Sequence, residues 1–232
     1  MKMLKVSFLV MTMLGLLIFT QNTANAEVSL NFYLGWAFTG EEDVEVDVDG
    51  ISFEGEADFE DSFTFGGRVA YWLENMPWLG LALDLSYFAP DSDDLDADVS
   101  VVPLSFLVMF RGQLMKSSAF PNGQLHPYFG IGPGIFFSSI DFDDIDIREN
   151  GIEFGLDLDD NSTDVGLDVR AGLAWFYTLN WDIFFEYRFT SVEAEFDGDV
   201  RGVIYGERVS EEFDVEPELN THHFLVGLSY HF

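Results

Sequence analysis

The sequence predicts an all-β fold, an eight-stranded antiparallel up-and-down transmembrane β-barrel. Three observations support this prediction. Apolar residues alternate with small or polar residues, a period of two that is typical of strands. The alternating segments are about as long as the ~9–11 residues of a tilted membrane strand, or slightly longer. Acid-rich and acid-poor joints alternate between them. The segments are 28–38, 62–73, 79–89, 99–111, 126–140, 164–177, 181–192 and 220–232.

The composition excludes several classes of protein. The 232 residues carry a formal net charge of −32, yet 48% are hydrophobic and 16% are aromatic. Disordered acidic chains are poor in aromatic residues, so the chain is not globally disordered. An acidic field repels phosphates, which excludes nucleic acid as a partner. The chain has no cysteine, which excludes disulfides, zinc–thiolate sites and thiol nucleophiles.

Residues 1–26 are predicted to be a secretory signal peptide, and 27–232 a single barrel domain. Two lysines precede an apolar run over 6–19, and an Ala-Asn-Ala cleavage site ends at Ala26. A membrane-anchoring helix is the alternative, but it needs about 20 apolar residues, more than this run provides.

The alternation separates two faces along each segment. In 79–89 the leucines and Tyr87 share one face. A soluble two-sheet sandwich would alternate as well and is the alternative fold. Soluble strands are usually about 5–6 residues long, however, and the polar face here is rich in glycine and alanine, which suits the narrow interior of a small barrel. The face of 79–89 that carries these small residues comprises Gly80, Ala82, Asp84, Ser86 and Phe88.

The joints predict which end of the barrel faces outward. Four acid-rich joints hold 35 of the 42 acidic residues. Bacterial barrels place short turns in the periplasm and long loops outside, so we expect extracellular acid-rich loops and periplasmic termini. Apolar and acidic residues alternate over 44–49, which predicts strands that continue into a projecting hairpin. The acid-rich joints are 39–61, 90–98, 141–163 and 193–219, and the acid-poor joints are 74–78, 112–125 and 178–180.

Six charged side chains, three basic and three acidic, are predicted to point into the barrel. A charge inside a barrel is stable only when it is paired and hydrogen-bonded. An eight-stranded barrel is just wide enough to be filled by side chains. We therefore favour a stabilising salt-bridge network over an ion path or a catalytic set. Pro133, which follows inward-facing glycines, predicts a β-bulge. The six residues are Arg68, Asp84, Asp168, Arg170, Glu186 and Arg188.

Residues 45–56 match the spacing of a calcium loop, with acids at Glu45, Asp47, Asp49 and Glu56 and a glycine between them. The first ligand is Glu rather than Asp, and the alternating valines favour a strand. We therefore expect weak binding of Ca²⁺ or Mg²⁺ to clustered carboxylates rather than an EF-hand, and no other cofactor. A solvated anionic surface with diffuse counterions is the alternative.

The stretch PYFGIGPGIFF at 127–137, the closing HHFLVGLSYHF at 222–232 and the pattern of joints resemble the small eight-stranded outer-membrane β-barrel proteins, which include opacity-type and outer-membrane-protein-A-type barrels. The resemblance implies the outer membrane of a Gram-negative bacterium and contact with its lipid and lipopolysaccharide. We expect a monomer. The resemblance further implies a C-terminal signal for the barrel-assembly machinery at Val226, Leu228, Tyr230 and Phe232.

We expect a non-enzymatic structural or surface protein whose acidic loops bind cations, partners, or lipopolysaccharide through bridging cations. A narrow, porin-like pore for small molecules is the first alternative, and a lipid-modifying enzyme is the second. The sequence contains no G-x-S-x-G, H-E-x-x-H or phosphate-loop motif. His222 faces outward near the acid-rich joints, but Thr221 points to the opposite face and no serine takes a partner position. We therefore assign no catalytic residue.

Overall fold

The computed structural model describes residues 27–48, 51–59, 61–90, 97–142, 145–149, 152–157, 159–204 and 207–232. Side chains are described outside 41–60, 91–98, 141–160 and 197–216. The predicted signal peptide lies outside the described residues. Within them, no helix has the length and apolar character needed to cross a membrane.

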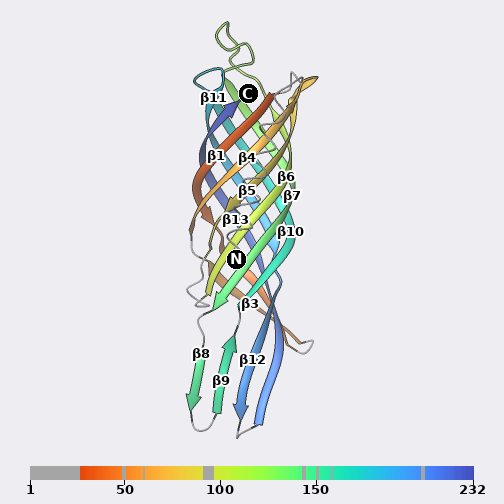
Figure 1. Ribbon diagram of the computed structural model, residues 1–232, viewed down its shortest axis with the longest axis vertical. Coiled ribbons are helices and arrows are strands. Elements are labelled where there is room, and N and C mark those ends of the chain that lie inside the picture. The colour runs from red at the N-terminus through yellow and green to blue at the C-terminus, as the bar shows by residue number, and fades with distance from the viewer. Residues whose placement is uncertain are drawn as a thin grey trace.

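The chain forms a closed, all-antiparallel barrel of eight strands, which confirms the predicted fold class. Each strand pairs with the next barrel strand along the chain, and the last pairs with the first to close the barrel, from Ser29↔His231 to Phe38↔His222. Figure 1 shows these strands tilted relative to the long axis of the barrel. The barrel strands are β1 (Glu27–Phe38), β4 (Ser62–Leu73), β5 (Met76–Tyr87), β6 (Ala97–Arg111), β7 (Leu125–Phe142), β10 (Asp159–Phe176), β11 (Trp181–Glu193) and β13 (Glu207–His231).

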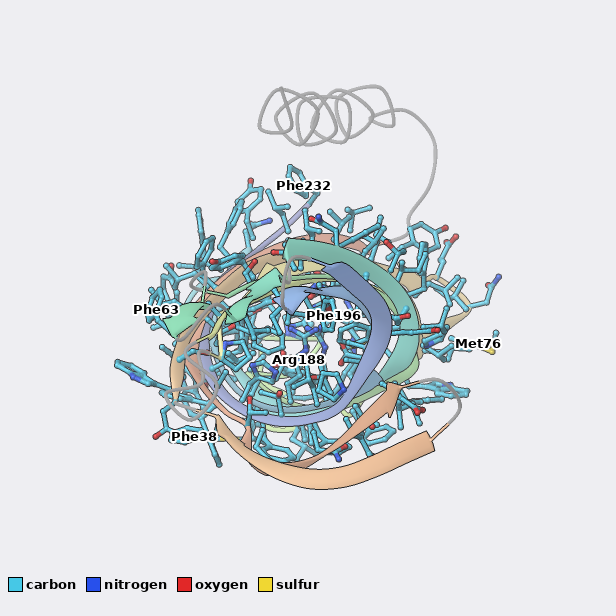
Figure 2. The ribbon with its side chains drawn as sticks, turned by 90° about the horizontal axis from the view of Figure 1, so that it is seen from below. Phe38, Phe63, Met76, Arg188, Phe196 and Phe232 are labelled. Carbon is cyan, nitrogen blue, oxygen red and sulfur yellow. The ribbon has the colours of Figure 1, made fainter. Side chains whose placement is uncertain are left out.

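The predicted division into two faces is confirmed. On the small-residue face of β5, Gly80, Ala82, Asp84 and Ser86 are buried, and so is Phe88, which directly follows the strand. On the outer face, large apolar side chains stay exposed, among them Phe32 at 62% and Phe185 at 65%. Figure 2 shows Phe38 and Phe63 pointing away from the barrel and Arg188 lying inside it. These large apolar side chains therefore coat the outside of the barrel.

Glycines on the inward face make room for large rings. A Cβ on Gly172 would lie 2.4 Å from the ring of Tyr128. Similar overlaps occur at three other glycines, each paired with an aromatic residue on the neighbouring strand. In a barrel this narrow, the missing side chain of each of these glycines leaves the space that the ring on the neighbouring strand occupies. The four ring–glycine pairs are Tyr33–Gly66, Trp72–Gly80, Tyr128–Gly172 and Phe184–Gly227.

Three of the four acid-rich joints form strands that extend the wall of the barrel. They build an antiparallel sheet in the order β3, β2, β13, β12, β9, β8, called the acidic sheet below. This confirms the hairpin predicted around 44–49 and extends it. Gly40 has φ +77°, where the chain leaves β1 for this sheet. The added strands are β2 (Gly40–Val48), β3 (Ile51–Phe59), β8 (Ile145–Glu149), β9 (Ile152–Asp157) and β12 (Phe196–Ile204).

The two ends of the barrel differ accordingly. The acidic end carries the acidic sheet, and β8, β9 and β12 project from it in Figure 1. The opposite, acid-poor end carries Glu27, Phe232 and the joints 74–78, 112–125 and 178–180. In the longest of these joints, a turn over Pro-Asn-Gly at 121–123 closes with a hydrogen bond from the Gly123 amide to the Phe120 carbonyl, at 3.0 Å.

The bulge predicted at Pro133 is wrong. Strands β6 and β7 keep one register on both sides of it, with Ser105↔Gly134 and Val108↔Ile131. The ladder is interrupted between these two pairs, as expected beside a residue that has no N–H to donate. A register shift is found instead between Trp72 and Leu73 in β4.

Candidate functional site in the lumen

The six charges predicted to face inward all lie buried in the barrel interior, the lumen, with exposures of 3% or less. They occupy the middle of the lumen and come from four strands. Arg68 lies on β4, Asp84 on β5, Asp168 and Arg170 on β10, and Glu186 and Arg188 on β11. The three basic and three acidic groups are called the charge plug below.

Two ion pairs of the plug cross the lumen. Arg68 is paired in register with Asp84, yet its Nη1 donates to Glu186 Oε2 at 2.7 Å. Arg170 Nη1 donates to Asp84 Oδ2 at 2.7 Å. In each case three strand steps around the barrel separate the partners. Side chains thus tie opposite walls together, which neighbouring-strand pairing alone would not do.

Asp168 holds two arginines that would otherwise repel each other. Arg170 and Arg188 are paired directly across β10 and β11, and like charges so placed are destabilising. Asp168 accepts two bonds from Arg170, at 2.9 and 2.8 Å, and one from Arg188 Nε at 3.1 Å. Ser105 Oγ also donates to Asp168, at 2.6 Å. A single carboxylate therefore bridges and positions both guanidinium groups.

Neutral polar groups that sequence reasoning did not assign complete the plug. Tyr33 Oη donates to Asp84 Oδ1 at 2.7 Å, and Tyr128 Oη donates to Glu186 Oε2 at 2.8 Å. Arg188 Nη1 donates to Ser86 Oγ at 2.6 Å. The inward position of Tyr33 follows from the period of two, but its partner on another strand does not.

An apolar cluster lies beyond the charge plug, towards the acidic end. It is built from buried side chains at the acidic-end halves of five barrel strands, from two residues that directly follow β5 and β11, and from the start of β12. Figure 2 shows Phe196 inside the ring of strands. Sequence reasoning missed this cluster because apolar residues were assigned mainly to the outer face. Its members are Ala37, Phe88, Val99, Val101, Phe136, Ile140, Val192, Ala194, Phe196 and Leu219.

A second polar network lies at the acid-poor end. Arg111 binds both carboxylate oxygens of Glu27, at 2.6 and 2.5 Å, and its guanidinium lies 4.1 Å from the ring centre of Trp72. His231 contacts Glu27 Oε1 at 2.7 Å and Asp182 Oδ2 at 2.5 Å. The network joins β1, β6, β11 and β13. All four charged or titratable residues have inward parity in their strands, so the alternation could have identified them.

Glu27 lies at the rim, one residue before the spanning segment 28–38. Burial raises the pKa of its carboxyl group, but the hydrogen bonds and charges of Arg111 and His231 outweigh burial and lower the pKa to about 2. Glu27 is therefore ionised at neutral pH and remains available to Arg111.

The remaining predicted site residues are placed as follows. Asp49 lies outside the described residues, and the side chains of Glu45, Asp47 and Glu56 lie outside the described side chains. The backbone around them runs in the hairpin of β2 and β3. Three residues of the expected assembly signal lie on the outer face of β13, where Val226 and Leu228 are exposed and Tyr230 is half-buried. The fourth, Phe232, directly follows the strand and is exposed.

His222 faces outward near the acidic end, as expected, and is exposed. Among the described residues, the hydroxyl of Tyr187 is hydrogen-bonded to the Nδ1 atom of His222, at 2.7 Å. Thr221 is buried on the opposite face, where its hydroxyl lies 3.0 Å from that of Thr39. The His222–Tyr187 pair thus combines a possible base with a phenol, without an activated serine in the part of the chain described.

A family comparison agrees with this architecture. The sequence matches the model of the outer membrane protein beta-barrel domain over residues 11–232. The chain belongs to this family. Its family is one of outer-membrane β-barrels of Gram-negative bacteria. A comparison with curated proteins finds no match.

Solved structures of outer-membrane proteins resemble this barrel. The outer membrane protein OprG from Pseudomonas aeruginosa is 14% identical, with 89% of this chain and 96% of that chain covered and a TM-score of 0.58. Neisserial surface protein A is 13% identical, with 90% and 99% covered and a TM-score of 0.47. Ail of Yersinia pestis is 15% identical, with 90% and 100% covered and a TM-score of 0.42. At these identities the likeness to OprG concerns the fold alone, and the role must be argued from the site.

Proposed function

We propose that this outer-membrane barrel is a non-enzymatic, closed anchor that presents the acidic sheet at the cell surface. The acidic end is extracellular and both termini are periplasmic, because long connections face outward in bacterial barrels. The sheet shares β13 with the barrel wall, so the barrel holds it directly and no flexible linker intervenes.

The observation that carries this proposal is that the charge plug and the apolar cluster follow one another along the lumen. Ions would first have to pass the charge plug, in which the exposed fraction of each residue is 3% or less. They would then have to pass a cluster of apolar side chains, where an ion loses hydration and pays a large desolvation penalty. This arrangement favours a structural role over the alternative of a narrow pore.

Planar-bilayer recording tests the closure. The protein, refolded and checked by heat-modifiable gel migration, is expected to give no discrete conductance steps above those of protein-free bilayers. A general porin in the same lipid is the positive control. Reproducible steps that scale with the amount of folded protein would favour the pore and overturn the closed anchor.

The acidic sheet is proposed to bind divalent cations weakly and to contact lipopolysaccharide through bridging cations, because hard cations prefer clustered carboxylates. Calorimetric titration with Ca²⁺ and Mg²⁺ at moderate salt is expected to show saturable binding. Replacement of Glu45, Asp47, Asp49 and Glu56 by their amides is the matched variant. Heat that follows ionic strength alone, in both proteins, would instead indicate diffuse counterions.

Two further parts of the proposal concern the outer face. We propose that the exposed C-terminal residues are read during barrel assembly, so Phe232→Ala should lower the yield of heat-modifiable protein in membranes more than Phe224→Ala does.

We propose that the His222–Tyr187 pair is not catalytic. Mass spectrometry of lipid A should give the same spectrum with wild-type protein and with His222→Ala, whereas a modification lost in the variant would establish an enzyme.

A further inference from the structure

His222 is an exposed polar side chain among aromatic rings on the outer face of the barrel. The ring centres of Tyr187 and Phe189 lie 6.0 and 5.1 Å from its own, and the Tyr187 hydroxyl is bonded to its Nδ1 atom. A phenol is a better donor than an imidazole N–H, so Tyr187 donates and Nδ1 accepts. Nε2 then carries a hydrogen, and that hydrogen has no acceptor within the described part of the chain.

The depth of His222 in the membrane limits what can accept this hydrogen. Near the acid-poor end, the ring of Tyr230 packs against Trp181 with 4.9 Å between ring centres, as in an interfacial aromatic girdle. From Tyr230 to His222 along β13 is roughly 20 Å of membrane depth, at ~3.3 Å per residue and a tilt of ~40°. The apolar band is about 25 Å tall. His222 therefore lies just inside its opposite boundary, where water is scarce and the polar region of the lipid begins.

The charge at this boundary favours a neutral acceptor. Glu193 and Glu218 are exposed and paired in register, and they lie beyond His222 towards the acidic end. Two carboxylates at this place repel an anionic group such as a lipid phosphate. The ester carbonyl of a lipid carries no net charge, accepts a hydrogen bond and lies at the edge of the hydrocarbon. It therefore suits both the depth and the charge.

A shallow groove of about 660 Å³ lies on the outer face beside the His222–Tyr187 pair and extends from Tyr187 towards the acid-poor end. Three large rings and one small side chain form a row along it, and the small side chain leaves the groove open. The members of this row are paired in register across β10, β11, β13 and β1, and they are Ala171, Tyr187, Phe224 and Trp36.

We propose that the His222–Tyr187 pair and this groove, together called the lipid site below, bind one ester-linked membrane lipid. His222 Nε2 donates a hydrogen bond to an ester carbonyl oxygen, and the acyl chain of that ester lies in the groove. The proposed function places the acidic end outside the cell, so the lipid belongs to the outer leaflet. No covalent bond forms or breaks at the lipid site, in agreement with a non-enzymatic barrel.

Solid-state NMR tests the contact directly. The folded protein carries histidine with ¹⁵N in the ring and is reconstituted in phosphatidylcholine with ¹³C in its ester carbonyls. A hydrogen bond places Nε2 about 4 Å from the carbonyl carbon, which dephasing of the ¹⁵N signal by ¹³C detects. His126, His223 and His231 are buried in the barrel and are internal controls, and His222→Phe assigns the signal of His222.

We expect dephasing of the His222 signal and none of the three buried histidines. Ala171→Leu fills the groove but leaves the His222–Tyr187 pair unchanged, so it should reduce the dephasing. A wild-type His222 signal without dephasing would overturn the lipid site, because water would then satisfy Nε2. Equal dephasing of all four histidines would overturn its specificity. Dephasing that Ala171→Leu leaves unchanged would overturn the groove as the place of the acyl chain.

The energetic contribution is tested with a diether phosphatidylcholine of the same chain length, which has no carbonyl acceptor. The ratio of the folding equilibrium constants in diester and diether vesicles should be about fivefold larger for wild type than for His222→Phe, the size of one neutral hydrogen bond. Phe106→Leu, an exposed change on the outer face of β6, should keep the wild-type ratio. Equal ratios for wild type and His222→Phe would overturn a stabilising contact. Neither measurement depends on conduction or on orientation, so the lipid site can fail while the closed anchor stands.

Discussion

Replacing Arg170 by methionine should destabilise the barrel more than any other single change in the charge plug. The guanidinium donates to Asp168 through two nitrogens, to Asp84 at 2.7 Å and to Glu186 at 3.3 Å. Without it, Asp168 keeps Arg188 and Glu186 keeps Arg68. Asp84 keeps a single described hydrogen bond, from the hydroxyl of Tyr33.

The expected cost follows from this loss. The plug changes from three positive and three negative groups to a buried excess of one negative charge. Removing one partner of a buried ion pair typically costs about 3–5 kcal/mol, and every 1.4 kcal/mol is about a tenfold change in the folding equilibrium. The variant Arg170→Met with Asp84→Asn restores the charge balance, so it should recover roughly half of the loss, about 2 kcal/mol.

The assay is urea unfolding of the protein folded in lipid vesicles, followed by tryptophan fluorescence and by heat-modifiable gel migration. Wild type, Arg170→Met and the double variant are compared at one lipid composition and one salt concentration. A loss below about 1 kcal/mol in Arg170→Met would be the size of a surface ion pair and would refute a structural role for the plug. A double variant less stable than the single variant would refute the charge-balance explanation.

Three other predictions follow from packing and charge. Gly66→Ala should cost about 1–3 kcal/mol, because the new Cβ would lie 2.5 Å from Tyr33 Oη; Gly67→Ala, where the nearest atom is 3.5 Å away, should be nearly neutral in the same unfolding assay. Phe136→Ala should cost about 3–5 kcal/mol by leaving a cavity in the apolar cluster, and a loss typical of an exposed position would contradict that cluster. Glu27→Gln should cost about 1–2 kcal/mol at pH 7, since the pKa of Glu27 is lowered from 4.5 to about 2 and its side chain is 25% exposed. Because a lowered folded-state pKa stabilises above the unfolded value, the difference between wild type and Glu27→Gln should shrink as the pH falls below about 4.5, and a difference independent of pH down to 3 would contradict this.

The period of two made most of the barrel predictable from the sequence. It placed eight spanning segments and put Asp84, Asp168 and Arg170 inside, because alternation fixes the direction of each side chain. It did not fix which charges meet. Arg68 bonds with Glu186 three strand steps away, and only the closure and register of the barrel bring those two together.

Two other features were not predicted from the sequence, for different physical reasons. The apolar cluster at the acidic end contains Phe88 and Phe136, which look like lipid-facing residues by composition alone although their parity is inward. The rim network was missed because Glu27, Asp182 and His231 lie at strand ends, where the limits of a segment are least certain. Pro133 was expected to force a bulge. Instead, the β6–β7 ladder is interrupted beside Pro133, which has no N–H to donate, and the register does not shift.

Strand β13 is 25 residues long, or roughly 80 Å at ~3.3 Å per residue. An apolar band about 25 Å tall occupies about 10 residues of a strand tilted by ~40°. The remaining length therefore carries the acidic sheet roughly 35–40 Å beyond the hydrocarbon. Electrostatic screening in physiological salt acts over about 8 Å, so the outermost carboxylates lie several screening lengths from the lipid surface. β13 thus acts as a rigid spacer. The charge at its tip is screened from the membrane surface, and an approaching molecule reaches that charge before it reaches the membrane.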